Sequence, residues 1–358
     1  MKKDVLNGIL NALIRDRLSP TPTERTRIST EYEFLCAVVG GVCFQSGSYA
    51  RFTSTTPVND LDVIWQVPES ALDREVIRKS FGPNGSAQYD PSLVLARLAE
   101  KLKAAYRATG RNVTVMPQSH SVGIYFGSKE DFSIDLVPAI ASGRRNSYGA
   151  DIYWVPEIAD LSHQRRSAFY ETHRPMGWLL SDPRGYIESA RELNEANPAF
   201  RKSAKFGRKW RKGCKKSDPA LALKSFHLEL MVDDILRRLR GGTVVDALKA
   251  LFDEMPVRLG RSQFPDRADP SRFVDEYVMR LTPAERESIL KRARVASSLI
   301  DEMLLPSSGD ADVRRLIDRI LDGTAVAAVT APAIAASSSY TPRSTFQPPR
   351  NYGRSDQR

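Results

Sequence analysis

Three aspartates and a Gly-Ser turn carry the chemistry that this sequence suggests. Gly47-Ser48 precedes Asp60 and Asp62, and Asp135 lies further along the chain between two apolar residues. In a β-strand, residues i and i+2 point to the same face, so Asp60 and Asp62 project together. Carboxylates held close together bind the two Mg²⁺ ions that transfer of a nucleotidyl group from a triphosphate requires. We therefore predict a two-metal catalytic site at Asp60, Asp62 and Asp135.

The Gly47-Ser48 turn is suited to hold the phosphates of the substrate. Glycine lets backbone N–H groups approach phosphate oxygens closely, and the serine hydroxyl adds a donor. Arg51 follows in a helical turn whose N-terminal amides would face the same anion. A lone Gly-Ser turn or a lone Asp-x-Asp pair is usually an ordinary surface feature. Their combination with a later strand aspartate favours a catalytic site.

Positive charge is concentrated between Arg201 and Lys216, where nine Lys and Arg occur without an acidic residue. This segment accounts for most of the formal net charge of +10. Helical spacing places an apolar stripe on one face of this segment and four cations on another. We assign Trp210 to the apolar stripe as a core residue. These cations are Arg201, Lys205, Arg208 and Lys212. Because like charges repel, we expect an anion here: the substrate triphosphate at one end, and a nucleic-acid or protein activator along 201–216. A solvated helix face is the alternative.

The elements that must position these residues follow from capping and periodicity. In the first half of the chain, helices are marked by prolines in a first helical turn and by glycines at their ends, and strands by alternating apolar residues. They predict helices over 3–17, 23–39 and from Asp90-Pro91 to Gly110, and strands over 42–45, 61–67, 113–115, 122–126, 132–136 and 152–155.

The second half of the chain is predicted to be helical, because strand signals become rare after residue 155. Helices are expected to open at Asp182-Pro183 and at Asp218-Pro219, and another covers 199–215. Thr282 and Glu285 form a capping box for a helix toward Leu305. A last helix is expected over 312–321, and the Ala, Ser, Thr and Pro content of 324–358 predicts a flexible tail.

These motifs are similar to those of a known superfamily. The segments GSYARFTSTTPVNDLDV and IDLVPA resemble the signature of the DNA polymerase beta type nucleotidyltransferases. Downstream, SDPRGYIE, AFRKSAKFGRKW and LKSFHLEL resemble the helical half of the cGAS/DncV-like nucleotidyltransferases, the CD-NTases of bacterial anti-phage (CBASS) systems. The resemblance covers roughly residues 35 to 240.

The resemblance implies an α+β fold with two lobes. A polymerase beta-like palm, a mixed sheet with helices, would occupy 1–155 together with the N-terminal helices. A helical lobe that closes the active cleft would occupy 156–323, followed by the tail at 324–358. The length of 358 residues fits this organisation.

The resemblance also implies roles for single residues. Asp60, Asp62 and Asp135 would hold two Mg²⁺ ions, for which Mn²⁺ is a substitute, and Gly47 and Ser48 would hold the donor triphosphate. Further nucleotide-binding residues would be Ser225 beside the phosphates, Phe226 stacked on a base, Arg51, and a phosphate-gripping cation among Lys205, Arg208 and Lys209. The substrates would be ATP, with GTP, CTP or UTP as alternatives, and the product a cyclic or linear oligonucleotide that activates a downstream effector in phage defence.

Two other functions fit the same residues. A template-independent RNA-tailing or CCA-adding enzyme also carries a Gly-Ser turn and paired acids, and the basic helix would suit RNA. An inactive nucleotide or nucleic-acid sensor would keep the fold, although the intact aspartates argue against it.

Three further observations narrow the class of protein. The cysteines Cys36, Cys43 and Cys214 show no CxxC pairing, which favours a reducing, cytoplasmic location. The N-terminus lacks the apolar centre of a signal peptide, and no apolar run approaches a membrane span. The histidines His120, His163, His173 and His227 lack metal-ligand spacing, so they are expected to support the structure or the site residues rather than to catalyse. Asp135 is the candidate general base by position alone.

Overall fold

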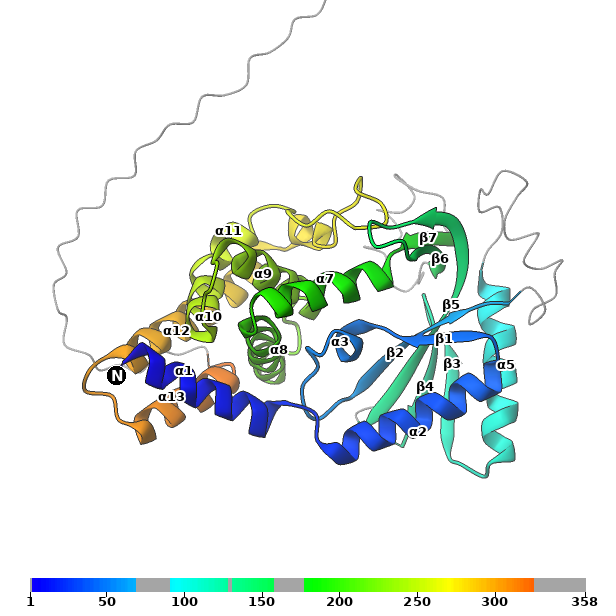
Figure 1. Ribbon diagram of the computed structural model, residues 1–358, viewed down its shortest axis with the longest axis horizontal. Helices are drawn as coiled ribbons and strands as arrows, with labels where there is room; N and C mark the ends of the chain where they lie inside the picture. The colour runs from blue at the N-terminus through cyan, green and yellow to red at the C-terminus, as the bar shows by residue number, and fades with distance from the viewer. Residues whose placement is uncertain (1, 69–90, 128–130, 158–176, 325–358) are drawn as a thin grey trace, which may run out of the picture. The chain divides into compact units, whose positions relative to one another are not determined.

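The carboxylates lie on a mixed sheet of seven strands formed by the described part of the chain (Figure 1). The computed structural model describes residues 2–68, 91–127, 131–157 and 177–324. Five strands follow the order β1-β2-β5-β4-β3, while β6 pairs with the far end of β5 and β7 pairs with β6. The pair β2 and β5 is parallel, and the others are antiparallel. The strands are β1 (Val42–Gln45), β2 (Asp60–Gln66), β3 (Val113–Pro117), β4 (Val122–Phe126), β5 (Phe132–Arg145), β6 (Asp151–Glu157) and β7 (Gly177–Ser181).

One face of this sheet is covered by α2 (Pro22–Val39) and α5 (Ser92–Ala108), which lie beside the strands in Figure 1. The predicted start of α2 is confirmed, because Thr21 and Glu24 form a capping box there. Apolar residues of both helices form one buried cluster with β2, β4 and β5. This cluster fixes β2 and β5 side by side and thereby fixes the positions of their aspartates.

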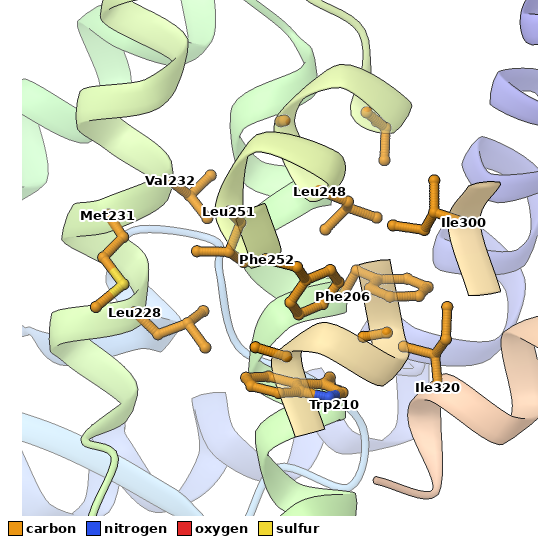
Figure 2. Packing of buried hydrophobic residues seen from close by; sticks show 14 of the residues in the cluster. Phe206, Trp210, Leu228, Met231, Val232, Leu248, Leu251, Phe252, Ile300 and Ile320 are labelled. Atoms are coloured by element: carbon orange, nitrogen blue, oxygen red, sulfur yellow. The ribbon is translucent and has the colours of Figure 1, made fainter. Parts of the chain in front are cut away.

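A second buried cluster is helical, and α8 (Ala199–Ser217) runs through it (Figure 2). Trp210 is 1% exposed and meets Phe252 edge to face at 4.9 Å, which confirms its assignment to the core. No helix of the described ranges is long and apolar enough to cross a bilayer. The other helices are α1 (Lys3–Leu13), the π-helical turn η1 (Ile14–Leu18), α3 (Gly47–Ala50), α7 (Pro183–Ala196), α9 (Ser225–Arg238), α10 (Val244–Asp253), α11 (Met255–Arg258), the 3-10 helix η2 (Glu276–Arg280), α12 (Pro283–Leu304) and α13 (Asp310–Leu321).

The first helix packs with the helical cluster although it is distant from that cluster in sequence. Leu6, Leu10 and Leu13 of α1 are buried there, next to residues of α10 and α12. Sequence order alone would place this helix with the sheet, because neighbours in sequence usually pack together. The domain boundaries 1–155 and 156–323 stay a prediction, and the tail predicted at 324–358 lies almost entirely outside the described residues.

One expected helix is absent, β5 continues to Arg145 beyond the expected 132–136, and one strand was not expected. Asp218-Pro219 does not open a helix, and α9 begins at Ser225. Asp218 instead caps the end of α8, and its carboxylate accepts a hydrogen bond from Ser288 at 2.7 Å. The strand β7 was missed, because a short apolar run shows neither the period of a strand nor that of a helix.

Candidate active site

The Gly47-Ser48 turn is built against the strand that carries the first two aspartates. Gly47 has a φ of 63°, and a Cβ at this position would collide with the carboxylate of Asp62. The backbone N–H of Ser46 donates to the carbonyl of Asp62 at 2.8 Å, and the N–H of Thr53 donates to the carbonyl of Ser48 at 2.9 Å. Only glycine combines this backbone conformation with so close an approach.

The three aspartates lie on neighbouring strands. Asp62 of β2 is directly opposite Asp135 of β5 in the parallel register, and Asp60 lies two residues before Asp62 on the same strand. Burial, together with the charges of Asp60 and Asp135, raises the pKa of Asp62 to about 6. Burial and the charge of Asp60 also raise the pKa of Asp135, whereas hydrogen bonds from Gln118 and Ser121 act to lower it. The register of β2 and β5 therefore places these carboxylates on neighbouring strands, as the sequence predicts.

The donor set fits Mg²⁺ in its chemistry, since carboxylate oxygens are the ligands that this ion prefers. Burial, and after it the neighbouring carboxylate charges, raises the pKa of Asp62 and of Asp135, so a bound cation would stabilise their ionised forms. Within the described ranges, however, no three His, Cys, Asp or Glu side chains are gathered tightly enough to hold one ion. Asp60, Asp62 and Asp135 are therefore suitable ligands, but their oxygens are not drawn together in this conformation.

Arg208 of α8 is the predicted cation that reaches the Gly-Ser turn. Its guanidinium donates to the Ser48 hydroxyl at 3.0 Å, and another of its nitrogens lies 3.8 Å from the carboxylate of Glu229. Its Nε is buried without a hydrogen-bond partner. The serine hydroxyl and the arginine thus form one polar pair at the predicted phosphate position.

Arg51, another predicted nucleotide-binding residue, is engaged inside the protein. It donates to both carboxylate oxygens of Glu229, at 2.6 and 3.3 Å, and both side chains are less than 10% exposed. The Thr53 hydroxyl donates to the same carboxylate at 2.8 Å. Sequence reasoning missed Glu229, although an acidic residue within the apolar face of α9 is a detectable signal.

The aromatic partner predicted for a base lies beside this ion pair. The Arg51 guanidinium is 4.6 Å from the centre of the Phe226 ring, and Tyr186 meets that ring edge to face at 5.0 Å. Ser225 and Phe226 line the same cavity as the Gly-Ser turn. The predicted stacking residue therefore lines the cavity of the Gly-Ser turn and has the Arg51 guanidinium against its ring.

Most of the predicted site residues line one cavity of about 590 Å³. Asp135 lines a neighbouring cavity of about 500 Å³, which shares Asp62 and His120 with the larger one. The predicted site residues that line the larger cavity are Gly47, Ser48, Arg51, Asp60, Asp62, Arg208, Ser225 and Phe226.

Lys205 and Lys209 do not line either of these cavities. The Lys205 ammonium donates to the Ser19 hydroxyl at 2.9 Å. Burial, with the nearby charges of Arg25 and Arg201, lowers its pKa to about 8. Lys205 therefore faces the segment before α2, and only Arg208 of the three candidate cations reaches the Gly-Ser turn.

The rest of the basic stripe on α8 also contacts this chain. The Lys212 ammonium donates to the Pro57 carbonyl at 3.2 Å and to the Asn59 side chain at 3.1 Å. The Arg201 guanidinium lies 4.7 Å from the centre of the Phe52 ring. Each of the four predicted cations thus contacts the segment between Ser19 and Asn59, whereas binding of an activator along 201–216 stays a prediction.

Known structures share this architecture. No protein-family model and no curated protein matches the sequence. The chain is similar to the structure of Escherichia coli MS115-1 CdnC with ATP, at 17% identity and a TM-score of 0.61, covering 89% of this chain and 98% of that one. The chain has the CD-NTase fold.

Other structures with the CD-NTase fold support the same alignment. Bradyrhizobium diazoefficiens CdnG in complex with GTP gives 12% identity and a TM-score of 0.57, covering 88% of this chain and 99% of that one. Vibrio cholerae DncV, a cyclic AMP-GMP synthase, gives 12% identity and a TM-score of 0.55, covering 89% and 84%. Because the likeness spans nearly the whole described chain, the CD-NTase fold includes both the sheet and the helices.

Proposed function

We propose that this chain is a metal-dependent nucleotidyltransferase that joins NTPs into a cyclic or linear oligonucleotide. The observation that carries the proposal is the register of β2 and β5, which sets Asp62 opposite Asp135. The Gly-Ser turn and Arg208 lie at the same cavity. Carboxylates beside a phosphate-binding turn are the combination that nucleotidyl transfer needs.

The reaction would join an acceptor hydroxyl to the α-phosphorus of a donor NTP. The bond from the hydroxyl oxygen to phosphorus forms as the bond from phosphorus to the pyrophosphate oxygen breaks, and the hydroxyl proton leaves to water. Ser48 and Arg208 would donate hydrogen bonds to the phosphates, and Phe226 would offer its ring to the donor base. Asp60, Asp62 and Asp135 would hold Mg²⁺, which when bound neutralises phosphate charge and lowers the pKa of the hydroxyl.

The neighbours' names guide the choice of product. One similar structure is described as a cyclic AMP-GMP synthase, and others contain ATP or GTP. By this likeness we propose that the product is a cyclic or linear oligonucleotide second messenger that acts on an effector in anti-phage defence. The RNA-tailing alternative has less support, because the cations expected to bind RNA contact residues 19–59 of this chain.

One incubation separates these functions. Purified protein is mixed with labelled NTPs and Mg²⁺, with and without RNA, and the products are treated with phosphatase. A small phosphatase-resistant product is expected, and label in RNA would favour tailing instead. The double variant Asp60→Asn, Asp62→Asn serves as the control and should form no product. Equal amounts of product from this variant and the natural chain would contradict the proposal.

A further inference from the structure

Two cavities meet at the carboxylates, and their linings differ in charge. The cavity with the Gly-Ser turn includes the cations Arg208 and Arg272. The neighbouring cavity is lined, within the described residues, by no Lys or Arg: its lining is Asp62, Gln118, Ser119, His120, Ser121, Asp135 and Val137. A triphosphate is stabilised by cations, whereas a neutral sugar hydroxyl can lie beside carboxylates. The second cavity therefore suits the acceptor hydroxyl of the proposed reaction.

His120 lines both cavities, at the point where they share Asp62. It lies in the tight turn between β3 and β4, which is closed by a hydrogen bond from the Gln118 N–H to the Ser121 carbonyl at 2.8 Å. Strand β4 pairs with β5, so that Gly123 is opposite Asp135. The turn is therefore held just beyond the third aspartate.

A backbone contact sets the tautomer of the His120 ring. Its Nδ1 lies 2.9 Å from the carbonyl oxygen of Pro156. A carbonyl oxygen can only accept a hydrogen bond, so Nδ1 carries the hydrogen. In the neutral ring, Nε2 then carries a lone pair that can accept a hydrogen bond. His120 is an exposed residue and lines both cavities.

The same turn is fastened to Asp135. Gln118 and Ser121 of the turn act to lower the pKa of Asp135, and the Ser121 hydroxyl donates to the Gln118 side chain at 2.9 Å. A Cβ on Gly123 would collide with the Gln118 amide, so this glycine makes room for the arrangement. The turn is therefore positioned next to Asp135, since β4 pairs with β5 directly after it.

We propose that His120 orients the acceptor: its Nε2 accepts a hydrogen bond from the attacking hydroxyl and directs the oxygen toward the α-phosphorus. This inference rests on the proposed nucleotidyl transfer. Gln118 and Ser121 are positioning residues, because their mutual hydrogen bonds close the turn on which His120 lies.

The test uses an acceptor that cannot act as a donor. Labelled ATP is mixed with varied concentrations of a nucleoside monophosphate, and formation of the labelled dinucleotide is followed. His120→Ala should lower kcat/KM for the monophosphate roughly ten- to hundredfold, the usual effect of losing one such hydrogen bond. His120→Gln should restore much of the activity, because its amide oxygen can accept the hydrogen bond. Both variants should bind a non-hydrolysable ATP analogue as the natural chain does.

Thr114→Ala is the matched control, because Thr114 is exposed on the same hairpin and lines neither cavity. Activity of His120→Ala within twofold of the natural chain would overturn this inference alone. Joint loss of ATP affinity and thermal stability would show a structural role and also overturn it. If the natural chain transfers no nucleotide, the proposed function fails and this inference fails with it.

Discussion

Gly47 combines a positive φ with a close approach to Asp62, one of the carboxylates of the proposed catalytic site. Its positive φ is a conformation that other residues adopt only with strain, and the space of its absent side chain is filled by Asp62. Gly110 provides a comparison, because it also has a positive φ, of 66°, but a Cβ at that position would have no other atom within 4 Å. Substitution of Gly110 therefore tests backbone strain alone, whereas substitution of Gly47 tests strain together with a collision.

Gly47→Ala should therefore lose both stability and activity. We expect a loss of about 1–3 kcal/mol in the free energy of unfolding, and product formation should fall at least a hundredfold because Asp62 is displaced. Gly110→Ala should lose about 1 kcal/mol and keep its activity. Urea denaturation and the NTP incubation measure the two effects. Equal activity of the two variants would show that the close approach to Asp62 is unimportant.

A buried histidine supports the segment that carries Ser225 and Phe226. The His227 Nδ1 and the Tyr277 hydroxyl are joined by a hydrogen bond of 2.8 Å, and the same hydroxyl accepts one from the backbone N–H of Lys224 at 3.1 Å. Burial, with the charges of Arg258 and Lys224, lowers the pKa of His227 to about 3. Asp275 lies 3.6 Å away. The structural role expected for this histidine is thus present beside the cavity.

This histidine should make the fold sensitive to acid. Its pKa is near 6.5 in the unfolded chain and lower in the folded one, so below pH 6.5 the unfolded state binds the proton first. The stability that His227 contributes is complete above pH 6.5 and is lost toward pH 3, by about 1.4 kcal/mol per pH unit. Urea denaturation at pH 7.5 and 5 should show a larger loss for the natural chain than for His227→Gln. Equal losses would contradict this assignment.

At the scale of elements, α9 is joined to the segment after α3 by the buried pair of Arg51 and Glu229. The two residues are 178 positions apart in sequence. Removing one partner of a buried ion pair leaves an uncompensated charge, which costs more than the pair itself contributes. Glu229 should therefore be far more sensitive to truncation than a surface acid.

Glu229→Ala should destabilise the fold by about 3–5 kcal/mol, because Arg51 would remain charged and buried. The combined variant Arg51→Met, Glu229→Leu removes both charges and should be more stable than Glu229→Ala. Urea denaturation of Arg51→Met, of Glu229→Leu and of their combination gives the coupling energy. A double variant as unstable as the sum of the single variants would show that the two residues do not act as a pair.

Local signals predicted most of these elements, and long-range contacts explain the remainder. Thr282 and Glu285 predicted the start of α12 correctly, because a capping box involves only residues close together in sequence. Asp218-Pro219 carries a similar signal, but its aspartate is used by Ser288. Glu229 was missed because its partner Arg51 is distant in sequence.

At the scale of the whole molecule, the fold expected from the motifs is the one observed, whereas side-chain directions were only partly predictable. The periodicity of α8 separated its apolar and cationic faces correctly. It could not show that the cationic face meets residues between Ser19 and Asn59, because α1 and the following segment are distant in sequence. A charged stripe predicts an electronegative partner without saying whether the partner belongs to the same chain.

Shortening the chain tests where its stability resides. Both large apolar clusters lie within the described residues, and the compact unit that contains them ends at Val326. A chain ending at Val326 should keep its unfolding midpoint within about 2 °C of the natural chain, a difference below about 1 kcal/mol. Thermal unfolding followed by circular dichroism measures this shift. A fall of about 10 °C would show that residues 327–358 contribute to the fold.

The hydrogen bond between Arg208 and Ser48 bears on how a nucleotide would be recognised under the proposed function. A long side chain normally loses rotational freedom when it grips a ligand, which weakens binding. The Arg208 side chain is only 11% exposed and already directed at the turn, so this ordering has taken place during folding. A bound phosphate would then replace the Ser48 hydroxyl as the acceptor for Arg208. The affinity for the nucleotide would reflect the strength of this new hydrogen bond, with little loss of side-chain entropy.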